Sequence, residues 1–287
     1  IFPRKFLWGA ATAAHQVEGG NYNQWTVWEL ENAKVKSAQA EYQYDDWENW
    51  PRIKRYALDP NNYVSGKLAN HYERYDEDFD LLQKMHMNAF RFSIEWSRIE
   101  PREGAWSAKE IGHYKDYIDD LRRRGIEPIA TLFHFTLPVW FADKGGFEKR
   151  SNVKYFSRFV KKIVSELGPR LKYIITINEP EGYAISSYYF EDWPPAFHNP
   201  YKLWRVLNNL ALAHRQSAKI IHNLSSHYKV SIAKNSMYSY PGDDALLSRI
   251  SSKIMQYFQD DYFIRKVIKS CDFLGVNYYQ SNCLCGS

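Results

Sequence analysis

Short apolar segments alternate along the chain with longer segments whose apolar residues recur at intervals of three and four. The short segments predict strands buried on both faces, and the longer ones predict amphipathic helices. Successive strand–helix units are typical of a parallel sheet, so the pattern predicts an α/β fold. The predicted strands are residues 6–12, 88–94, 127–133, 172–178, 229–235 and 272–278.

Several helix boundaries can be predicted from capping residues. Ser151 is expected to be the N-cap of one helix, and Gly168 the C′ residue at its end. Asn199 followed by Pro200 is typical of an N-cap and a first-turn proline, so a helix is expected to begin there. The last helix is expected within residues 244–270.

Residues 28–70 interrupt the alternation. They follow the first predicted strand, are rich in charged and aromatic residues, and contain the turn sequence Asp-Pro-Asn-Asn at 59–62. We interpret them as a long βα loop inserted into a single domain of residues 1–287. Long loops at the carboxyl ends of barrel strands build or cover active sites. The alternative is a helical surface excursion that packs on its own tryptophans.

The second predicted strand has one apolar and one polar face. Phe90, Phe92 and Ile94 share one side, and Arg91 and Glu95 share the other. In a barrel the apolar set would contact the outer helices and the polar set would point inward. A buried arginine needs an anionic partner. The alternative to a functional role is a structural ion pair between Arg91 and Glu95 or another interior acid.

The fourth predicted strand ends in Asn178, Glu179 and Pro180. Proline cannot continue the strand ladder, so the amide and the carboxyl group should lie at the tip of the strand. A carboxyl group in a partly apolar pocket has a raised pKa and can protonate a leaving oxygen. The alternative is that Glu179 only caps a loop.

Three other predicted strands end near an uncharged hydrogen-bonding side chain. Gln16 follows the first strand, His134 follows the third, and Asn277 lies at the end of the sixth. The carboxyl ends of parallel strands meet at one face of a barrel, so these residues are expected to line one site.

Five segments resemble motifs of glycoside hydrolase family 1, and they occur in that family's order. They are FLWGAATAAHQVEG (6–19), FRFSIEWSRIEP (90–101), TLFHFTLPVWFADKGGF (131–147), TINEP (176–180) and DFLGVNYY (272–279). The resemblance covers essentially the whole chain. It implies a (β/α)₈ barrel that hydrolyses terminal β-D-glycosidic bonds with retention. It also implies small aryl glycosides or oligosaccharides as substrates, with no metal or organic cofactor.

The resemblance also implies the roles of the catalytic residues. Glu179 corresponds to the general acid/base, and Asn178 to the residue that bonds the sugar's 2-hydroxyl. Arg91 corresponds to the arginine that pairs with the nucleophile's carboxylate, which would supply its missing anion.

The same resemblance implies a set of substrate-binding residues. Gln16 and His134 match positions that hold the hydroxyls of the sugar, and Asn277 and Tyr279 match groups beside the nucleophile. Many family members have tryptophan after the histidine, whereas this chain has Phe135. An indole hydrogen bond is therefore expected to be absent at that position.

The chain departs from the family in one respect. It contains neither the TENG-like motif that carries the nucleophile nor the tryptophan-containing motif of the eighth strand, so it supplies about six of eight strands. Glu18, Glu95 and Glu181 are nearby acids, but each has a structural role available. The alternatives to an enzyme are a catalytically inactive sugar-binding member and a chain that self-associates. The open barrel edges would then pair in a homodimer or with a complementary C-terminal chain.

Composition excludes some partners. The net charge of +5 is spread along the chain without basic runs, so neither nucleic acid nor a membrane surface is an expected partner. The expected partner is a small β-glycoside. Aromatic residues make up 17% of the chain, which weakly favours sugar binding. Cys271, Cys283 and Cys285 are not a disulfide framework, and no apolar run could span a bilayer, so we expect a cytoplasmic protein.

Overall fold

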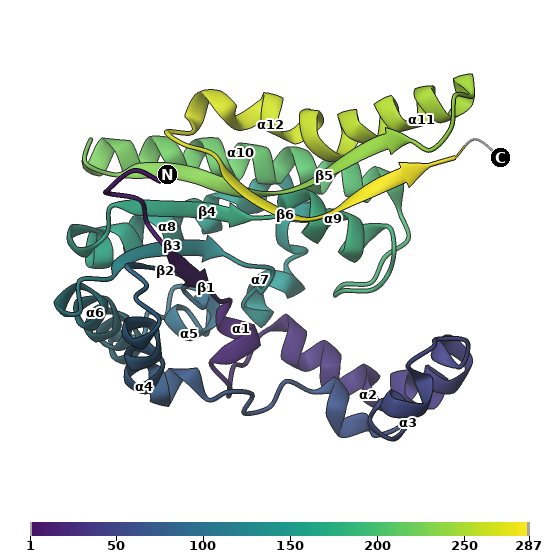
Figure 1. The fold of residues 1–287 in the computed structure, drawn as a ribbon. Coiled ribbons are helices and arrows are strands. Elements are labelled where there is room, and N and C mark those ends of the chain that lie inside the picture. The colour runs from purple at the N-terminus through teal and green to yellow at the C-terminus, as the bar shows by residue number, and fades with distance from the viewer. Residues whose placement is uncertain (1, 286–287) are drawn as a thin grey trace.

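The computed structural model describes residues 2–285, in which six strands form one parallel sheet in the order of the sequence. The sheet curls into part of a barrel (Figure 1). This confirms the prediction of an incomplete (β/α)₈ barrel. The strands are β1 (Gly9–Ala11), β2 (Ala89–Ser93), β3 (Glu127–Phe133), β4 (Tyr173–Asn178), β5 (Lys229–Pro241) and β6 (Gly275–Leu284).

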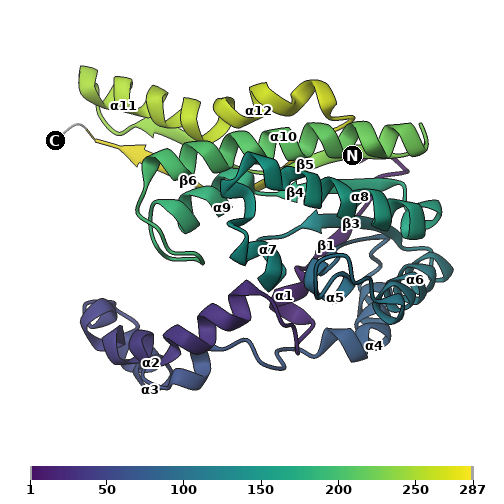
Figure 2. The same ribbon diagram turned by 180° about the vertical axis from the view of Figure 1, so that it is seen from behind.

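Helices cover the outer side of the sheet, where α6 contacts β3, α10 contacts β4 and β5, and α11 contacts β5 (Figure 2). The helices before β4 are α1 (Ala14–Val17), α2 (Gln24–Tyr44), α3 (Trp50–Ala57), α4 (His71–Lys84), α5 (Trp96–Ile99), α6 (Ala108–Arg123), α7 (Val139–Asp143) and α8 (Val153–Leu167). Those after it are α9 (Pro180–Tyr188), α10 (Pro200–Leu224), α11 (Leu246–Gln256) and α12 (Tyr262–Val267), with a π-helical turn (Tyr257–Asp261) between the last two.

The main core lies between the sheet and these helices. Phe90 and Phe92 on β2, and Ile94 directly after it, are buried there, as predicted. The Phe79 ring on α4 contacts Phe90 at 5.8 Å between centroids, and the Tyr117 ring on α6 contacts Phe92 at 4.9 Å. Their burial turns the opposite face of β2, with its polar residues, toward the inside of the sheet.

Of the three predicted caps, Asn199 is confirmed, Gly168 ends α8 without the left-handed conformation of a C′ residue, and Ser151 is wrong. Asn199 caps α10 as expected, since its side chain accepts from Lys202 N at 3.0 Å. Ser151 instead lies in a 3₁₀ turn, Arg150–Asn152, that leads into α8. Gly168 has right-handed angles, φ −54° and ψ −43°, because the chain continues from α8 into a second 3₁₀ turn. A β-carbon at Gly168 would overlap the Tyr228 hydroxyl, so packing requires this glycine.

The strand lengths also differ from the prediction. β1 is only three residues long, whereas β5 and β6 continue past their predicted ends to Pro241 and Leu284. After an irregularity in register between Ser236 and Tyr238, the two strands stay paired from Tyr238 to Pro241. They therefore form a ribbon that extends beyond the rest of the sheet (Figure 1).

Residues 28–70, the predicted insertion between the first two strands, are largely helical. They contain most of α2, all of α3 and a 3₁₀ turn, Pro60–Tyr63. The excursion begins earlier than predicted, at Asn23, whose side chain accepts from Thr26 N at 3.1 Å. Its far end projects away from the sheet, while the start of α2 lies close to it (Figure 1). Within residues 2–285, none of the helices has the length and apolar character to cross a membrane.

Candidate active site at the carboxyl ends of the strands

Glu179 lies at the junction of β4 and α9 and is only 7% exposed. Its backbone is left-handed, φ +40° and ψ 63°, which is unfavourable for a residue with a side chain. Two backbone hydrogen bonds hold it: Glu179 N donates to Ala233 O at 2.6 Å, and Tyr183 N donates to Glu179 O at 2.9 Å. The chain therefore turns sharply where β4 ends, and Glu179 stays buried.

Two side chains of β6 contact the Glu179 carboxylate. Asn277 Nδ2 donates to Oε1 at 2.5 Å, and Tyr279 Oη donates to the same oxygen at 3.3 Å. Burial raises the pKa of Tyr279, and the charge of Glu179 raises it further, so the phenol stays a donor. The residue before Glu179, Asn178, joins this cluster by accepting from Asn277 Nδ2 at 3.2 Å.

Arg91 completes the cluster from β2. It donates to Asn178 Oδ1 at 2.5 Å, to Thr131 Oγ1 at 3.0 Å and to Asn277 Oδ1 at 3.4 Å. Burial lowers the pKa of Arg91, and the charge of Glu179 opposes that shift. The alternative of an ion pair with Glu95 is wrong, because the Glu95 carboxylate faces other residues.

The structure thus joins Arg91, Asn178, Glu179, Asn277 and Tyr279 in one hydrogen-bonded cluster. The residues around Glu179 in this cluster are hydrogen-bond donors or neutral groups. They come from three strands, β2, β4 and β6. Such a cluster can orient a carboxyl group and present polar atoms to a small ligand.

Gln16 and His134 line a neighbouring pocket of about 270 Å³. Burial, and then the charge of Arg91, lowers the pKa of His134 to about 3, so the imidazole is neutral at physiological pH. Its Nδ1 atom is buried and has no hydrogen-bond partner among residues 2–285. The side chain of Gln16 is exposed and also makes no hydrogen bond to the described part of the chain.

Aromatic residues that the sequence did not single out form the wall of this pocket. Trp25 and Trp193 both line it, with ring centroids 5.5 Å apart, and Phe135 packs on Trp193 at 4.7 Å. Trp25 Nε1 donates to Phe135 O at 3.3 Å, so an indole N–H lies at this corner even though Phe135 lacks one. No local sequence signal marked Trp193, which lies in the connection between α9 and α10.

A further polar residue near Glu179 was also missed. Asn235 on β5 has a buried Oδ1 without a hydrogen-bond partner among residues 2–285. Its amide and the Glu179 carboxylate both lie within 4 Å of the position that a β-carbon on Gly182 would take. It lies within a predicted strand, but its face could not be assigned without the sheet register.

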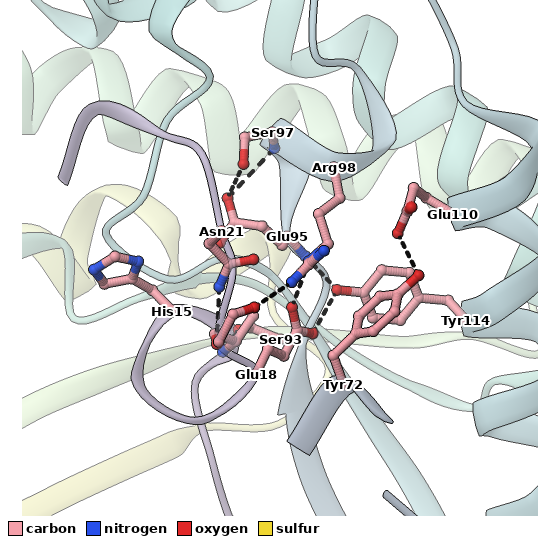
Figure 3. A network of polar contacts seen from close by, with 12 residues as sticks. His15, Glu18, Asn21, Tyr72, Ser93, Glu95, Ser97, Arg98, Glu110 and Tyr114 are labelled. Carbon is pink, nitrogen blue, oxygen red and sulfur yellow. Dashed lines mark hydrogen bonds and ion pairs between the residues drawn. The ribbon is translucent and has the colours of Figure 1, made fainter. Parts of the chain in front are cut away.

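Glu18, the C-cap residue of α1, is held in a buried network with α5 and α6 (Figure 3). Its carboxylate accepts from Arg98 Nε at 2.9 Å and from Tyr114 Oη at 2.7 Å. Burial raises the pKa of Glu18 to about 7, and the nearby Arg98 opposes this rise. Since Gln16 is two residues away, this network anchors the segment that carries it.

Glu95 and Glu181 also have partners. Glu95 accepts from the hydroxyls of Ser97 and Thr136, each at 2.8 Å. Glu181 Oε1 lies 3.2 Å from Lys234 Nζ, and burial raises the pKa of Glu181 to about 7 despite that cation. Among residues 2–285 no group of three histidine, cysteine or acidic side chains is arranged to bind a metal.

The glycosyl hydrolase family 1 model matches residues 1–270. β-Glucosidase A of Acetivibrio thermocellus is 31% identical over 85% of this chain and 50% of its own length. β-Glucosidase A of Thermotoga maritima is 28% identical over 98% of this chain and 66% of its own length. A 6-phospho-β-galactosidase of Clostridium acetobutylicum is 26% identical over 99% of this chain and 63% of its own length.

Solved structures show the same similarity. A β-glycosidase from Pyrococcus horikoshii matches 98% of this chain with a TM-score of 0.83 and 33% identity, over 63% of that structure. The Thermotoga maritima β-glucosidase in complex with glucoimidazole matches 98% of this chain with a TM-score of 0.83 and 26% identity, over 66% of that structure. The chain thus spans about half to two thirds of the length of these relatives.

Proposed function

This chain belongs to glycosyl hydrolase family 1, and we propose that it forms the acid-bearing part of a retaining β-glycosidase. The observation that carries the proposal is the placement of Glu179. Its buried carboxylate lies at the carboxyl end of β4, between two donors of β6 and beside the Arg91–Asn178 pair. In this role Glu179 protonates the departing glycosidic oxygen and then removes a proton from the attacking water.

The neutral polar residues around Glu179 would bind the sugar. We assign Asn178 to the 2-hydroxyl, Asn277 and Tyr279 to the groups near the anomeric carbon, and Gln16 and His134 to the other hydroxyls. The low pKa of His134, about 3, supports this assignment, because a neutral imidazole can both donate to and accept from hydroxyl groups.

A retaining mechanism also needs a nucleophile, a second carboxylate about 5 to 5.5 Å from the first. We assign Arg91 to hold that carboxylate, because it is a partly buried cation whose hydrogen bonds all go to neutral oxygens. The 287 residues of this sequence contain no TENG-like motif, and the acids nearest in sequence are paired elsewhere. The nucleophile is therefore expected from a segment or chain that complements this one.

We propose β-glucosides as the substrates, since the relatives include β-glucosidases from two bacteria. The wall formed by Trp25, Phe135 and Trp193 supports a sugar ligand, because flat aromatic faces pack on the apolar faces of pyranose rings. The reaction needs neither a metal nor an organic cofactor. The three free cysteines support the cytoplasm as the compartment.

A second candidate function is sugar binding without turnover. The engagement of Glu18, Glu95 and Glu181 in other contacts favours it, because none is left to act as the nucleophile. The exposed apolar side chains of Trp8 beside β1 and Val276 on β6 would then be available for pairing of two chains, as a homodimer or with a complementary chain.

The test is nitrophenol release from an aryl β-glucoside by the purified chain of verified mass, with azide added in place of the missing carboxylate, beside Glu179→Gln prepared identically. Binding of glucoimidazole is measured on both proteins by calorimetry. Release that falls at least about a hundredfold in the variant supports the enzyme. Glucoimidazole binding with no release from either protein supports the binding function. Absence of both contradicts the two proposals.

A further inference from the structure

Lys234 on β5 is almost fully buried, although its side chain carries a charge. Lys234 is 3% exposed and follows Ala233, whose carbonyl accepts from Glu179 N. Its Nζ lies 3.2 Å from Glu181 Oε1 and 3.2 Å from Asp260 Oδ1. It also donates to Asn235 O at 2.9 Å and to Gln259 O. An ammonium group that is buried this deeply is tolerated because four oxygens surround it.

The oxygens around Lys234 come from three elements that meet behind the candidate active site. Glu181 lies in the first turn of α9, which begins directly after Glu179. Gln259 and Asp260 lie in the π-helical turn between α11 and α12, and Asn235 lies on β5 itself. Lys234 therefore ties the start of α9 to the sheet on one side and to the outer helical layer on the other.

The π-helical turn is held so that Asp260 faces the lysine. Asp260 Oδ1 accepts from Ser236 Oγ at 2.5 Å, and its other oxygen accepts from Gln256. A π-helical turn carries one residue more per turn than an α-helix and is frequent at functional sites. Here it brings a carboxylate and a backbone carbonyl to the same ammonium group.

The side chains that precede Lys234 on the same side of β5 are apolar. Ile232 and Val230 on β5 are fully buried in the hydrophobic core on the same side of the strand as Lys234. Apolar packing would often be as stable as a buried ion cluster, but its contacts are not directional. A lysine that donates to two backbone carbonyls and forms ion pairs with two carboxylates defines where the attached elements lie.

We propose that Lys234, with Glu181 and Asp260, is a positioning residue for Glu179, because it fixes the first turn of α9 against β5. The left-handed backbone of Glu179 is unfavourable by itself and needs surrounding contacts to persist. The cluster around Lys234 supplies such a contact on the helix side, through Glu181, two residues after Glu179. This inference rests on the proposed role of Glu179 as the general acid/base.

Amide hydrogen exchange tests the positioning directly. The Tyr183 N–H is bonded to Glu179 O, and the Glu179 N–H to Ala233 O, so their exchange rates report whether the junction opens. In Lys234→Met we expect both amides to exchange at least about tenfold faster than in the wild type. The matched control is Lys115→Met, which removes a half-buried lysine paired with Glu166 at 2.8 Å away from the site. It should leave both rates within about twofold.

Activity gives the second readout, measured with azide in place of the missing nucleophile and with two substrates that differ in their need for an acid. Phenyl β-glucoside has a poor leaving group that needs protonation. The dinitrophenolate of dinitrophenyl β-glucoside leaves without protonation. A displaced Glu179 should lower kcat for the phenyl substrate at least about tenfold more than for the dinitrophenyl one, with KM nearly unchanged. A general loss of folded protein would lower both equally. If Lys234→Met fails to fold, Glu181→Gln replaces it, because glutamine keeps the shape of the side chain. This variant should give the same pattern with smaller changes in kcat.

The two proposals fail separately. Wild-type exchange rates at Glu179 and Tyr183 in a folded Lys234→Met or Glu181→Gln protein overturn the positioning role, whatever the activity. Faster exchange in both variants, together with wild-type turnover that Glu179→Gln does not reduce, supports the positioning role and counts against the proposed function. An equal loss for both substrates, with unchanged exchange, also overturns the inference.

Discussion

Removal of the buried arginine of the Glu18 network is expected to destabilise the protein in a pH-dependent manner. The side chains of Arg98 and Glu18 are 14% and 5% exposed, and they form an ion pair at 2.9 Å. Loss of one partner of such a pair typically costs about 3–5 kcal/mol, because the other charge stays buried. At about 2.1 cal/mol/K per residue, a chain of 287 residues has an unfolding entropy near 0.6 kcal/mol/K, so Arg98→Met should lower Tm by roughly 5–8 °C.

The sign of the pH dependence follows from Glu18. Its pKa in the folded protein is about 7, above the ordinary value of 4.5, so ionisation of Glu18 lowers the stability of the wild type as pH rises from 4.5 to 7. Arg98 opposes that rise in pKa, and its loss raises the folded pKa further. The deficit of Arg98→Met should therefore be smallest at pH 5, where Glu18 is protonated in both folded proteins and only the other contacts of Arg98, such as its hydrogen bond to Gly19 O, are lost. It should then grow once the pH exceeds about 7, by up to about 1.4 kcal/mol per pH unit.

Urea and thermal denaturation at pH 5 and pH 8 measure this difference. The control is Arg74→Met, which removes an exposed pair with Glu77 and should leave Tm unchanged at both pH values. A deficit of the same size at pH 5 and pH 8 would refute the reasoning, as would a deficit no larger than that of the control.

Three further outcomes are expected. Gly168→Ala should destabilise the protein by about 1–3 kcal/mol, because its β-carbon would overlap the Tyr228 hydroxyl. Gly112→Ala, in the open space of α6, should stabilise the protein by about 1 kcal/mol. Thermal melts that show the opposite order would contradict the packing. The imidazole of His134 should show no protonation between pH 5 and 8 by NMR, since its pKa is about 3, and a midpoint near 6.5 would exclude its burial. Asn277→Ala should weaken glucoimidazole binding about tenfold, because it removes the donor to Glu179, whereas Asn282→Ala, whose amide contacts Met237 Sδ at 3.9 Å, should have no effect. Equal affinities of the two variants by calorimetry would remove Asn277 from the site.

The periodic parts of the sequence predicted the fold well, because their signal is repeated along each element. The alternation on β2 placed Phe90 and Phe92 in the core and Arg91 inside the sheet. Glu179 was expected at a strand tip from its position before Pro180, and it lies there. These features depend on local pattern and on the rule that parallel strands end at one face.

Features that depend on tertiary packing could not be predicted. Helix-capping rules predict Gly168 as a C′ residue, but a glycine is needed there because a β-carbon would overlap the hydroxyl of Tyr228, a residue far along the chain. Ser151 has the side chain of an N-cap, yet the chain enters α8 through a 3₁₀ turn. Lys234 lies in a predicted strand, but its role depends on acids from α9 and the π-helical turn. Local propensity does not encode such contacts.

The central claim, that Glu179 donates the proton to the leaving group, is tested most directly by its dependence on the leaving group. The chain and Glu179→Gln are each given phenyl and dinitrophenyl β-glucosides, with and without added azide, which can attack the anomeric carbon in place of a missing carboxylate. In such a reaction azide attacks the anomeric carbon and displaces the aryloxide, and Glu179 protonates the departing aryloxide oxygen. The glycosyl azide forms with inversion. The account predicts that the substitution slows release of phenol by about 10²–10⁴-fold and release of dinitrophenol much less. Equal slowing for both leaving groups, or none, would contradict it.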